Sequence, residues 1–199
     1  SVELAYVLGY LTAEGCLSEN GRVIFTMADV EVMEHYYECF SDVFGVPVEV
    51  LRSKTRNVEG TLTCDFFSTE VYNFLRYLGG GTHSRDKKVP KCIRTGTREE
   101  VQAFLSAFYE GDGSINSTSV SCFSTSYELA SGIQQLLFNF GVISSLIERQ
   151  GKYHSQKNLN RIWHVITNGK NSAKSLRSYQ NVRLNLNLIS SEATTNMMF

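Results

Sequence analysis

The stretch "FYEGDG" (residues 108–113) ends an apolar, helix-like segment with acids and glycines, and "LTAEG" (residues 11–15) does the same near the start of the chain. The last glycine of the later stretch lies 98 positions after that of the earlier one. The same offset aligns small residues that recur every four positions, and this spacing places them on one helix face. We therefore expect two helices that pack closely through stripes of small side chains. The matched residues are Ala5, Gly9, Ala13, Ala103, Ala107 and Gly111.

The local sequence also predicts where these two helices begin and end. Thr97 and Glu100 fit a capping box at the start of the second helix, and Ser1 is expected to cap the first. Gly15 and Gly113 are expected to end the helices.

The segments after the two glycines match as well. Asn20-Gly21 predicts a hairpin turn before a strand at residues 23–28, and residues 115–125 have the same polar-then-strand character. Asp29 and Ser126 are expected to cap amphipathic helices that run into a "GV" pair in each half. The remaining expected elements are strands at residues 46–56, 61–67, 143–154 and 161–167, and helices near residues 69–78 and 171–179.

The element order αββαββα, occurring twice, predicts the α+β class with two pseudo-symmetric halves. The halves are expected at residues 1–96 and 97–189, with a tail at residues 190–199. An axis relating the halves would run along the two packed helices. Such an axis would bring Glu14 and Asp112 close together.

Composition indicates an intracellular protein with a sizeable core. The chain has 199 residues, of which 42% are hydrophobic, and no apolar run reaches the roughly 18 to 20 residues of a membrane span. The five cysteines are odd in number, widely spaced and without a CxxC pair. We therefore expect reduced thiols, no disulfide framework and no membrane partner, in the cytoplasm or in an organelle.

Charge is unevenly distributed along the chain although the net charge is only −1. Residues 23–51 contain six acids and no Lys or Arg, residues 149–183 contain eight bases and no acid, and residues 85–98 contain six bases. Such segregation can give a nearly neutral protein one basic face, although an ordinary solvated surface fits the same pattern.

Two neighbouring carboxylates either share a proton or hold cations. Hard divalent ions such as Mg²⁺ are bound by carboxylate oxygens, backbone carbonyls and water. Beside a phosphodiester, such ions activate water and stabilise the leaving oxygen, which is the chemistry of a nuclease.

Three other interpretations of the acids compete with this one. A calcium-binding EF-hand loop starts well at Asp112, but Ser117 stands where Gly is needed and Phe123 where Glu is needed. A glycosidase pair is chemically possible, yet Trp163 is the single tryptophan that could stack on a sugar. Two acids could also simply end two helices, an interpretation that the matched second copy disfavours.

The motifs "VLGYLTAEG" (residues 7–15) and "LSAFYEGDG" (residues 105–113) resemble the two copies of the LAGLIDADG motif of homing endonucleases. The segment "DKKVP" (residues 86–90) resembles the Lys-x-Pro segment that precedes the second motif in intein-encoded members. The resemblance covers nearly the whole chain, because the element order also matches a single-chain, two-motif member.

This resemblance implies a monomer whose two halves form a saddle of curved antiparallel sheets over double-stranded DNA. It implies Mg²⁺-dependent cleavage of both strands at a long, asymmetric site, with Mn²⁺ or Ca²⁺ able to substitute for Mg²⁺. Glu14 and Asp112 take the positions of the metal-binding acids, and Ala13 and Gly111 precede them. The basic residue near the active site corresponds to Lys88 or its neighbour Lys87.

The chain departs from the family pattern at two places. Glu14 stands where Asp is commoner, and the second basic position falls in "NVRLNLN", where Arg183 is the only candidate. Arginine cannot act as a base at ordinary pH. A cleavage-deficient DNA-binding protein or an RNA maturase is therefore the alternative, and a hydrolase of small substrates is a more distant one.

Candidate DNA contacts alternate along two expected strands, so that each set shares one strand face. Arg and Lys read guanine in the major groove, and Gln reads adenine. The sets are Arg52, Lys54 and Arg56, and Gln150, Lys152 and His154, with Arg149, Lys157, Arg161 and Lys170 as further DNA contacts that include phosphate contacts. His35, His83 and His164 show no metal-binding spacing and are expected to be structural or surface residues.

Overall fold

The computed structural model describes residues 1–168, apart from residues 19, 82, 116–118 and 152–159. The first half has the order αββααββα, one helix more than expected. Its elements are α1 (Val2–Glu14), β1 (Gly15–Ser18), β2 (Arg22–Met27), α2 (Val30–Phe44), α3 (Val48–Ser53), β3 (Thr55–Val58), β4 (Thr61–Phe67) and α4 (Thr69–Leu78). A linker follows with η1 (Ser84–Asp86) and α5 (Lys91–Arg94). The second set comprises α6 (Arg98–Asp112), β5 (Gly113–Ile115), β6 (Ser119–Ser124), α7 (Tyr127–Asn139), β7 (Ser144–Gly151) and β8 (Asn160–Asn168).

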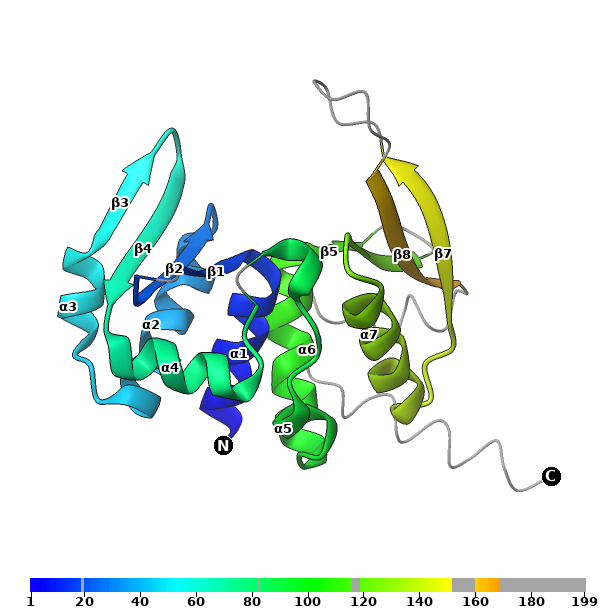
Figure 1. Cartoon of the computed structure of the whole chain (residues 1–199), viewed down its shortest axis with the longest axis horizontal. Helices are drawn as coiled ribbons and strands as arrows, with labels where there is room; N and C mark the ends of the chain where they lie inside the picture. Colours follow the sequence, from blue (N-terminus) through cyan, green and yellow to red (C-terminus); the bar gives the residue numbers. More distant parts are fainter. Residues whose placement is uncertain (19, 82, 116–118, 152–159, 169–199) are drawn as a thin grey trace. The chain divides into compact units, whose positions relative to one another are not determined.

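Each half builds a four-stranded antiparallel sheet with the same strand order (Figure 1). The order is β1-β2-β4-β3 in the first sheet and β5-β6-β8-β7 in the second. This confirms the α+β class and the two matched halves. The helix expected at residues 171–179 and the tail at residues 190–199 lie outside the described residues.

The chain divides into two compact units, Ser1–Asp112 and Gly113–Phe199. The repeat would place a boundary at residues 96 and 97, whereas the compact units divide after α6. The difference arises because α6 packs against α1 and so joins the first unit.

The predicted helix starts are confirmed. The Leu4 amide donates to the Ser1 hydroxyl at 3.4 Å, and the side chains of Asp29 and Ser126 cap α2 and α7. The capping box of α6 is complete, since the Thr97 amide donates to Glu100 Oε2 at 2.8 Å and the Glu100 amide to Thr97 Oγ1 at 3.3 Å.

The stripes of small residues bring α1 and α6 into backbone contact, as expected. A Cβ atom added at Gly9 would lie 2.4 Å from the Phe104 carbonyl oxygen and 2.7 Å from Ala107 Cβ. One added at Gly111 would lie 2.6 Å from Ala13 Cβ. The two helices run side by side in Figure 1. Any larger side chain at these positions would push the helices apart.

No residue separates α1 from the strand that follows it. The helix ends at Glu14 and β1 begins at Gly15, whose φ of −95° is open to any residue. Glycine is needed here for space, because a Cβ atom at this position would lie 2.4 Å from Leu11 Cα. The acid of the first motif is therefore fixed between a buried helix and a strand.

The strand expected at residues 46–56 is wrong. The structure has the short helix α3 (Val48–Ser53) followed by the strand β3 (Thr55–Val58). Alternating valines suggested a strand, but Pro47 lacks an amide hydrogen and holds φ at −57°, which suits the start of a helix. The helical turn also buries Leu51 completely. Arg52 consequently lies on a helix and Lys54 at its end, so the expected alternation of three bases along a strand is wrong too.

Candidate functional site

Glu14 and Asp112 meet at the carboxyl-terminal ends of α1 and α6. The close packing of the two helices brings the side chains near enough to share a hydrogen bond. Glu14 is exposed and Asp112 is half-buried. The two acids that the repeat aligned are therefore neighbours in space.

The environment of the pair favours one shared proton. Burial, followed by the negative charge of Glu14, raises the pKa of Asp112 from 3.8 to about 7, and the Lys87 ammonium partly opposes this. Near neutral pH the pair therefore holds a proton in part of the molecules. A divalent cation can replace that proton and neutralise both charges.

Lys87 is the lysine of "DKKVP" that lies at the acid pair. Its Nζ donates to the Ala13 carbonyl oxygen at 2.8 Å. Burial lowers the pKa of Lys87, whereas the carboxylates of Asp112 and Glu14 raise it. Lys88 is exposed and its side chain passes Gly79. The structure thus separates two neighbours that the sequence left as alternatives.

The oxygen donors at the pair fit a hard divalent cation. Within the described part of the chain, no group of three or more His, Cys, Asp and Glu side chains could hold a metal. The site instead offers two carboxylates and the Ala13 carbonyl, and Gly111 packs against Ala13. Mg²⁺, Mn²⁺ and Ca²⁺ accept such a set when water and phosphate oxygens complete it.

Glu110, the other acid of "FYEGDG", serves a different purpose from Asp112. Its Oε2 accepts a hydrogen bond of 2.5 Å from the Tyr10 hydroxyl, which also lies 2.8 Å from His35 Nδ1. The bond joins α6 to α1, and His35 links both to α2. Burial and the Glu110 charge raise the pKa of Tyr10. Glu110 therefore holds the helices together beside the pair, a contact between residues 100 positions apart that local sequence does not reveal.

Each sheet has one face packed against helices and one face turned away from them. In the first sheet, Val23, Phe25 and Cys64 are buried on the helix side. Because side chains alternate along a strand, the residues between them lie on the opposite side. We call this opposite side the first outer face: Cys16, Ser18, Arg22, Ile24, Thr26, Arg56, Val58, Thr61, Thr63, Asp65 and Phe67.

The second sheet follows the same rule. Val120, Cys122 and Val165 are buried, and Trp163 packs on Tyr127 of α7 at 4.7 Å between ring centroids. The alternate residues form the second outer face: Ser114, Ser119, Ser121, Phe123, Ser145, Ile147, Arg149, Ile162, His164 and Ile166.

The expected DNA contacts of the first half are only partly on the first outer face. Arg56 lies there and is exposed. Arg52 instead pairs with Glu34 of α2, with 2.6 Å between Nη2 and Oε2. Arg22, which the sequence did not single out, lies on this face and donates from Nε to Asp65 Oδ1 at 2.8 Å. Strand register, once known, would have revealed it.

In the second half, Arg149 lies on the second outer face and is exposed. Gln150 and Arg161 face the other side of their strands, and Arg161 pairs with Glu148 at 3.2 Å. Lys152, His154, Lys157, Lys170 and Arg183 lie outside the described residues.

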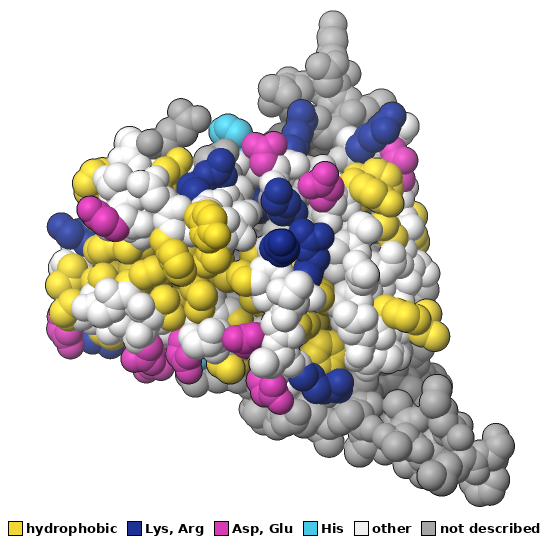
Figure 2. Space-filling view, turned by 60° about the horizontal axis from the view of Figure 1, so that its bottom comes forward, with side chains coloured by type: hydrophobic (Ala, Val, Ile, Leu, Met, Phe, Trp, Pro, Cys, Tyr) yellow, Lys and Arg dark blue, Asp and Glu magenta, His cyan; other side chains and the backbone are white. Residues whose placement is uncertain are grey.

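The linker carries several exposed bases, and Lys and Arg side chains also form a group in the space-filling view (Figure 2). Figure 2 turns the end of the molecule that carries α5 toward the viewer, and Lys and Arg side chains gather near the middle of this view. Among the linker bases, Arg85, Lys88, Lys91 and Arg94 are exposed.

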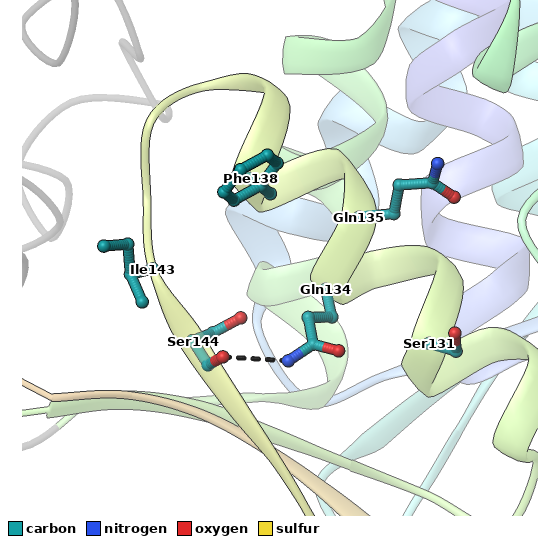
Figure 3. Close-up of a pocket in the computed structure, with 6 residues that line it drawn as sticks. All are labelled: Ser131, Gln134, Gln135, Phe138, Ile143 and Ser144. Atoms are coloured by element: carbon teal, nitrogen blue, oxygen red, sulfur yellow. Dashed lines mark hydrogen bonds between the residues drawn. The ribbon is translucent and has the colours of Figure 1, made fainter.

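A pocket of about 300 Å³ lies between α7 and the start of β7 (Figure 3). Gln134 Nε2 crosses it to donate to the Ser144 carbonyl oxygen at 2.8 Å, and the exposed Phe138 and Ile143 stand at its rim. Its described lining of Ser, Gln, Phe and Ile contains no titratable side chain. The described lining therefore offers no carboxylate, imidazole, thiol or amine as an acid or base.

Two further expectations concern the chain as a whole. All five cysteines are free thiols. None of the described helices has the length and apolar character needed to cross a bilayer.

The chain is similar in sequence to one protein family and to segments of several larger proteins. Residues 99–181 match the LAGLIDADG-like domain family. The small subunit of replication factor C from Methanocaldococcus jannaschii is 29% identical over 175 residues, covering 85% of this chain and 9% of that protein. The large subunit of DNA polymerase II from Thermococcus kodakarensis is 30% identical over 164 residues, covering 79% of this chain and 8% of that protein. The chain thus spans only a small part of these relatives.

Solved structures share the fold over most of the chain. Mesophilic variants of the homing endonuclease I-DmoI give a TM-score of 0.62 at 14% identity, covering 92% of this chain and 98% of theirs. I-DmoI in complex with DNA and Mn gives 0.60 at 13% identity, covering 92% and 97%. Full-length DUF199/WhiA from Thermatoga maritima gives 0.57 at 12% identity, covering 98% and 61%.

Proposed function

We propose that this chain, a protein of the LAGLIDADG type, is a site-specific DNA endonuclease. It would use divalent metal ions to cut both strands of a long, asymmetric target. The observation that carries this proposal is the contact between Glu14 and Asp112 at the ends of two closely packed helices. One exposed and one half-buried acid with a nearby carbonyl oxygen form the donor set that such chemistry needs.

Glu14 and Asp112 would hold Mg²⁺, with Ala13 and Gly111 contributing backbone oxygens. When bound, the ion would activate water and stabilise the leaving oxygen of the phosphodiester. Lys87 lies where it can neutralise charge that develops on the phosphate or take a proton from water. Burial lowers its pKa, which makes the neutral amine more accessible than in an exposed lysine. Structures of I-DmoI with DNA and Mn or Ca support the use of a divalent ion.

The two outer faces are the proposed DNA-binding surfaces, with Arg56 and Arg149 as contacts in the described residues. A two-stranded ribbon fits the major groove, where side chains on one face reach the base edges. Both halves lie in one chain, so we expect the enzyme to act as a monomer inside the cell.

A second candidate is a protein that binds DNA, or an intron RNA as a maturase, without cutting. The basic residues favour this candidate. Lys87 lies at the acid pair, whereas the corresponding segment of the second half offers only Arg183, and arginine cannot act as a base at ordinary pH. The same fold occurs in DUF199/WhiA as well as in I-DmoI, so the fold alone does not select cleavage.

The relatives suggest that the chain is an element inserted in a larger host protein. The matching segments make up 9% of a replication factor subunit, 8% of a DNA polymerase subunit and 20% of a replicative DNA helicase. Similar segments therefore occur within three different kinds of protein. Such a distribution, together with "DKKVP", supports an intein-type element carried within host proteins. An intron-encoded enzyme remains the alternative origin.

Cleavage by acid variants tests the function. A target is selected from a randomised DNA library by binding, and plasmid carrying it is incubated with Mg²⁺ and the full chain. We expect Glu14→Gln and Asp112→Asn to lower the cleavage rate by about 10²-fold or more while DNA affinity is kept. The exposed Glu38→Gln is the control and should cut normally. Unchanged double-strand cutting by both acid variants would reject the proposal, and binding without any nicking by the natural chain would favour the second candidate.

A further inference from the structure

The two sheets can be compared position by position because their strand registers match. In the first sheet, Gly15 aligns with one residue in each of the other three strands. Gly113 aligns in the same way in the second sheet. These aligned rows are Gly15, Phe25, Cys64 and Thr55, and Gly113, Cys122, Val165 and Leu146. Both rows face the helices, so the next row along each sheet lies on the outer face.

On the first outer face this next row is polar. It consists of Thr26, Thr63 and Arg56. The two threonine hydroxyls lie 3.3 Å apart in a hydrogen bond, and the Arg56 guanidinium is exposed. The ion pair of Arg22 and Asp65 crosses the same face nearby. The centre of this face therefore offers charged and hydrogen-bonding groups, while the exposed Val58 and Phe67 lie at strand ends.

On the second outer face the matching row is apolar and aromatic. It consists of Phe123, His164 and Ile147. The Phe123 ring stacks on His164 with 4.2 Å between centroids and an interplanar angle of 6°. Phe123 is 45% exposed and Ile147 is 40% exposed, whereas His164 is only 4% exposed.

The surroundings of this row keep the second outer face weakly charged. Burial lowers the pKa of His164, so that the ring is neutral at pH 7, and neither ring nitrogen has a hydrogen-bond partner in the described structure. Ile162 and Ile166 extend the apolar area along β8. Arg149 is the one charged side chain among the residues that define this face. Binding through phosphates alone would need more cations than the described face offers.

The base edges that suit these two faces differ. In the major groove, only thymine presents a methyl group, and apolar side chains such as Phe contact it. Guanine presents two acceptors that Arg binds in a bidentate manner. A duplex read by both faces would therefore differ in composition between its two halves.

We propose that Phe123 and Ile147 determine specificity by contacting thymine methyl groups in the half-site bound by the second sheet, while Arg56 reads the other half-site through hydrogen bonds. This assignment rests on the proposed DNA-binding function and names the substrate class more closely: an asymmetric duplex with one thymine-dependent half.

The test removes single methyl groups from the DNA. Each thymidine of a target selected from a randomised library is replaced in turn by deoxyuridine, which differs from thymidine only in the missing methyl group. Affinity of the full chain is measured at fixed salt by fluorescence anisotropy. We expect a loss of about fourfold per contacted methyl, confined to one half-site.

Variants assign that half-site to the second sheet. In the double variant Phe123→Ala/Ile147→Ala, deoxyuridine in the sensitive half should no longer weaken binding. Phe123→Ala alone should keep only the effect at methyl groups that Ile147 contacts, and Phe123→Leu should keep part of the effect. Thr26→Ala, at the matching position of the first outer face, should leave the deoxyuridine profile unchanged. Circular dichroism checks that each variant is folded.

Two outcomes would overturn the assignment, and they point to different failures. Equal deoxyuridine effects in both halves, or effects that persist in the Phe123→Ala/Ile147→Ala double variant, would reject the thymine contact while cleavage through Glu14 and Asp112 still stood. A second titration of the unmodified target at several salt concentrations checks the function itself, and the absence of any salt-sensitive DNA affinity would reject it.

Discussion

The two copies of the repeat are similar at the interface between α1 and α6 and different on the two outer faces. At the interface the copies are alike, since small residues at matched positions let the helices touch and bring the two acids together. On the outer faces the copies differ, since Thr26 and Thr63 correspond to Phe123 and His164. The interior tolerates no added atom, whereas the outer positions support either chemistry. The two copies therefore differ most on the sheet faces that lie away from the helix interface.

The strongest challenge to this comparison is an enlarged residue at the interface. Gly9→Val would drive two methyl groups and a Cβ into the Phe104 carbonyl and Ala107, so we expect the free energy of unfolding to fall by about 3 kcal/mol. Urea denaturation of the full chain measures this change. Thr26→Val on the first outer face is the comparison variant and should shift stability by less than about 1 kcal/mol. Similar losses in both variants would remove the distinction between the two regions.

A smaller effect is expected where the interface ends, at Asp112. Its pKa of about 7 in the folded protein exceeds the ordinary 3.8, so the folded state holds more protons than the unfolded state between these values. Stability therefore falls as pH rises through this window. Asp112→Asn should remove that fall and stabilise the protein by about 2 kcal/mol at pH 8, with little change at pH 4. This is about half of the roughly 4 kcal/mol that the full pKa difference would carry, because water partly screens the half-buried side chain.

Urea denaturation in chelator across this pH range measures the effect of Asp112→Asn. Glu38→Asn, at an exposed position on α2, controls for the loss of one carboxylate. An identical pH profile in Asp112→Asn and the natural chain would show that the acid is not held under strain by its neighbour.

The smallest effect is expected on the first outer face itself. Arg22 and Asp65 form an ion pair whose side chains are 43% and 23% exposed, so Arg22→Gln should cost only about 0.5 to 1 kcal/mol of unfolding free energy. A double-mutant cycle with Asp65→Asn isolates the coupling. A coupling above about 2 kcal/mol would show that this face, too, is constrained by the fold.

Local patterns in the sequence were sufficient for most of the scaffold. The capping box at Thr97 and the small-residue stripes each depend on residues three or four positions apart, and both are found in the structure. The 98-residue offset followed from comparing two such local patterns. The strand expected at residues 46–56 failed because Pro47 and the burial of Leu51 outweighed the preference of alternating valines for a strand.

Local sequence patterns predicted only part of the candidate site. The repeat predicted that Glu14 and Asp112 meet, but it could not choose between Lys87 and Lys88, because the choice depends on the path of the linker past Ala13. Arg22 and Phe123 were missed as surface residues, since their position on an outer face follows from strand pairing between distant segments. The bond between Tyr10 and Glu110 was missed for the same reason.

The junction of Glu14 and Gly15 limits how the molecule can be altered in length. The helix passes into the strand within one peptide unit, and the glycine lies against the Leu11 backbone. Inserting or deleting one residue here would rotate the acid around the helix by about 100° and reverse which side of β1 each residue faces. The β3 to β4 hairpin tip, where Glu59 and Gly60 both have positive φ, lies in solvent and can accept added residues. Reporter peptides or fused domains therefore belong at the hairpin tip and never at the motif.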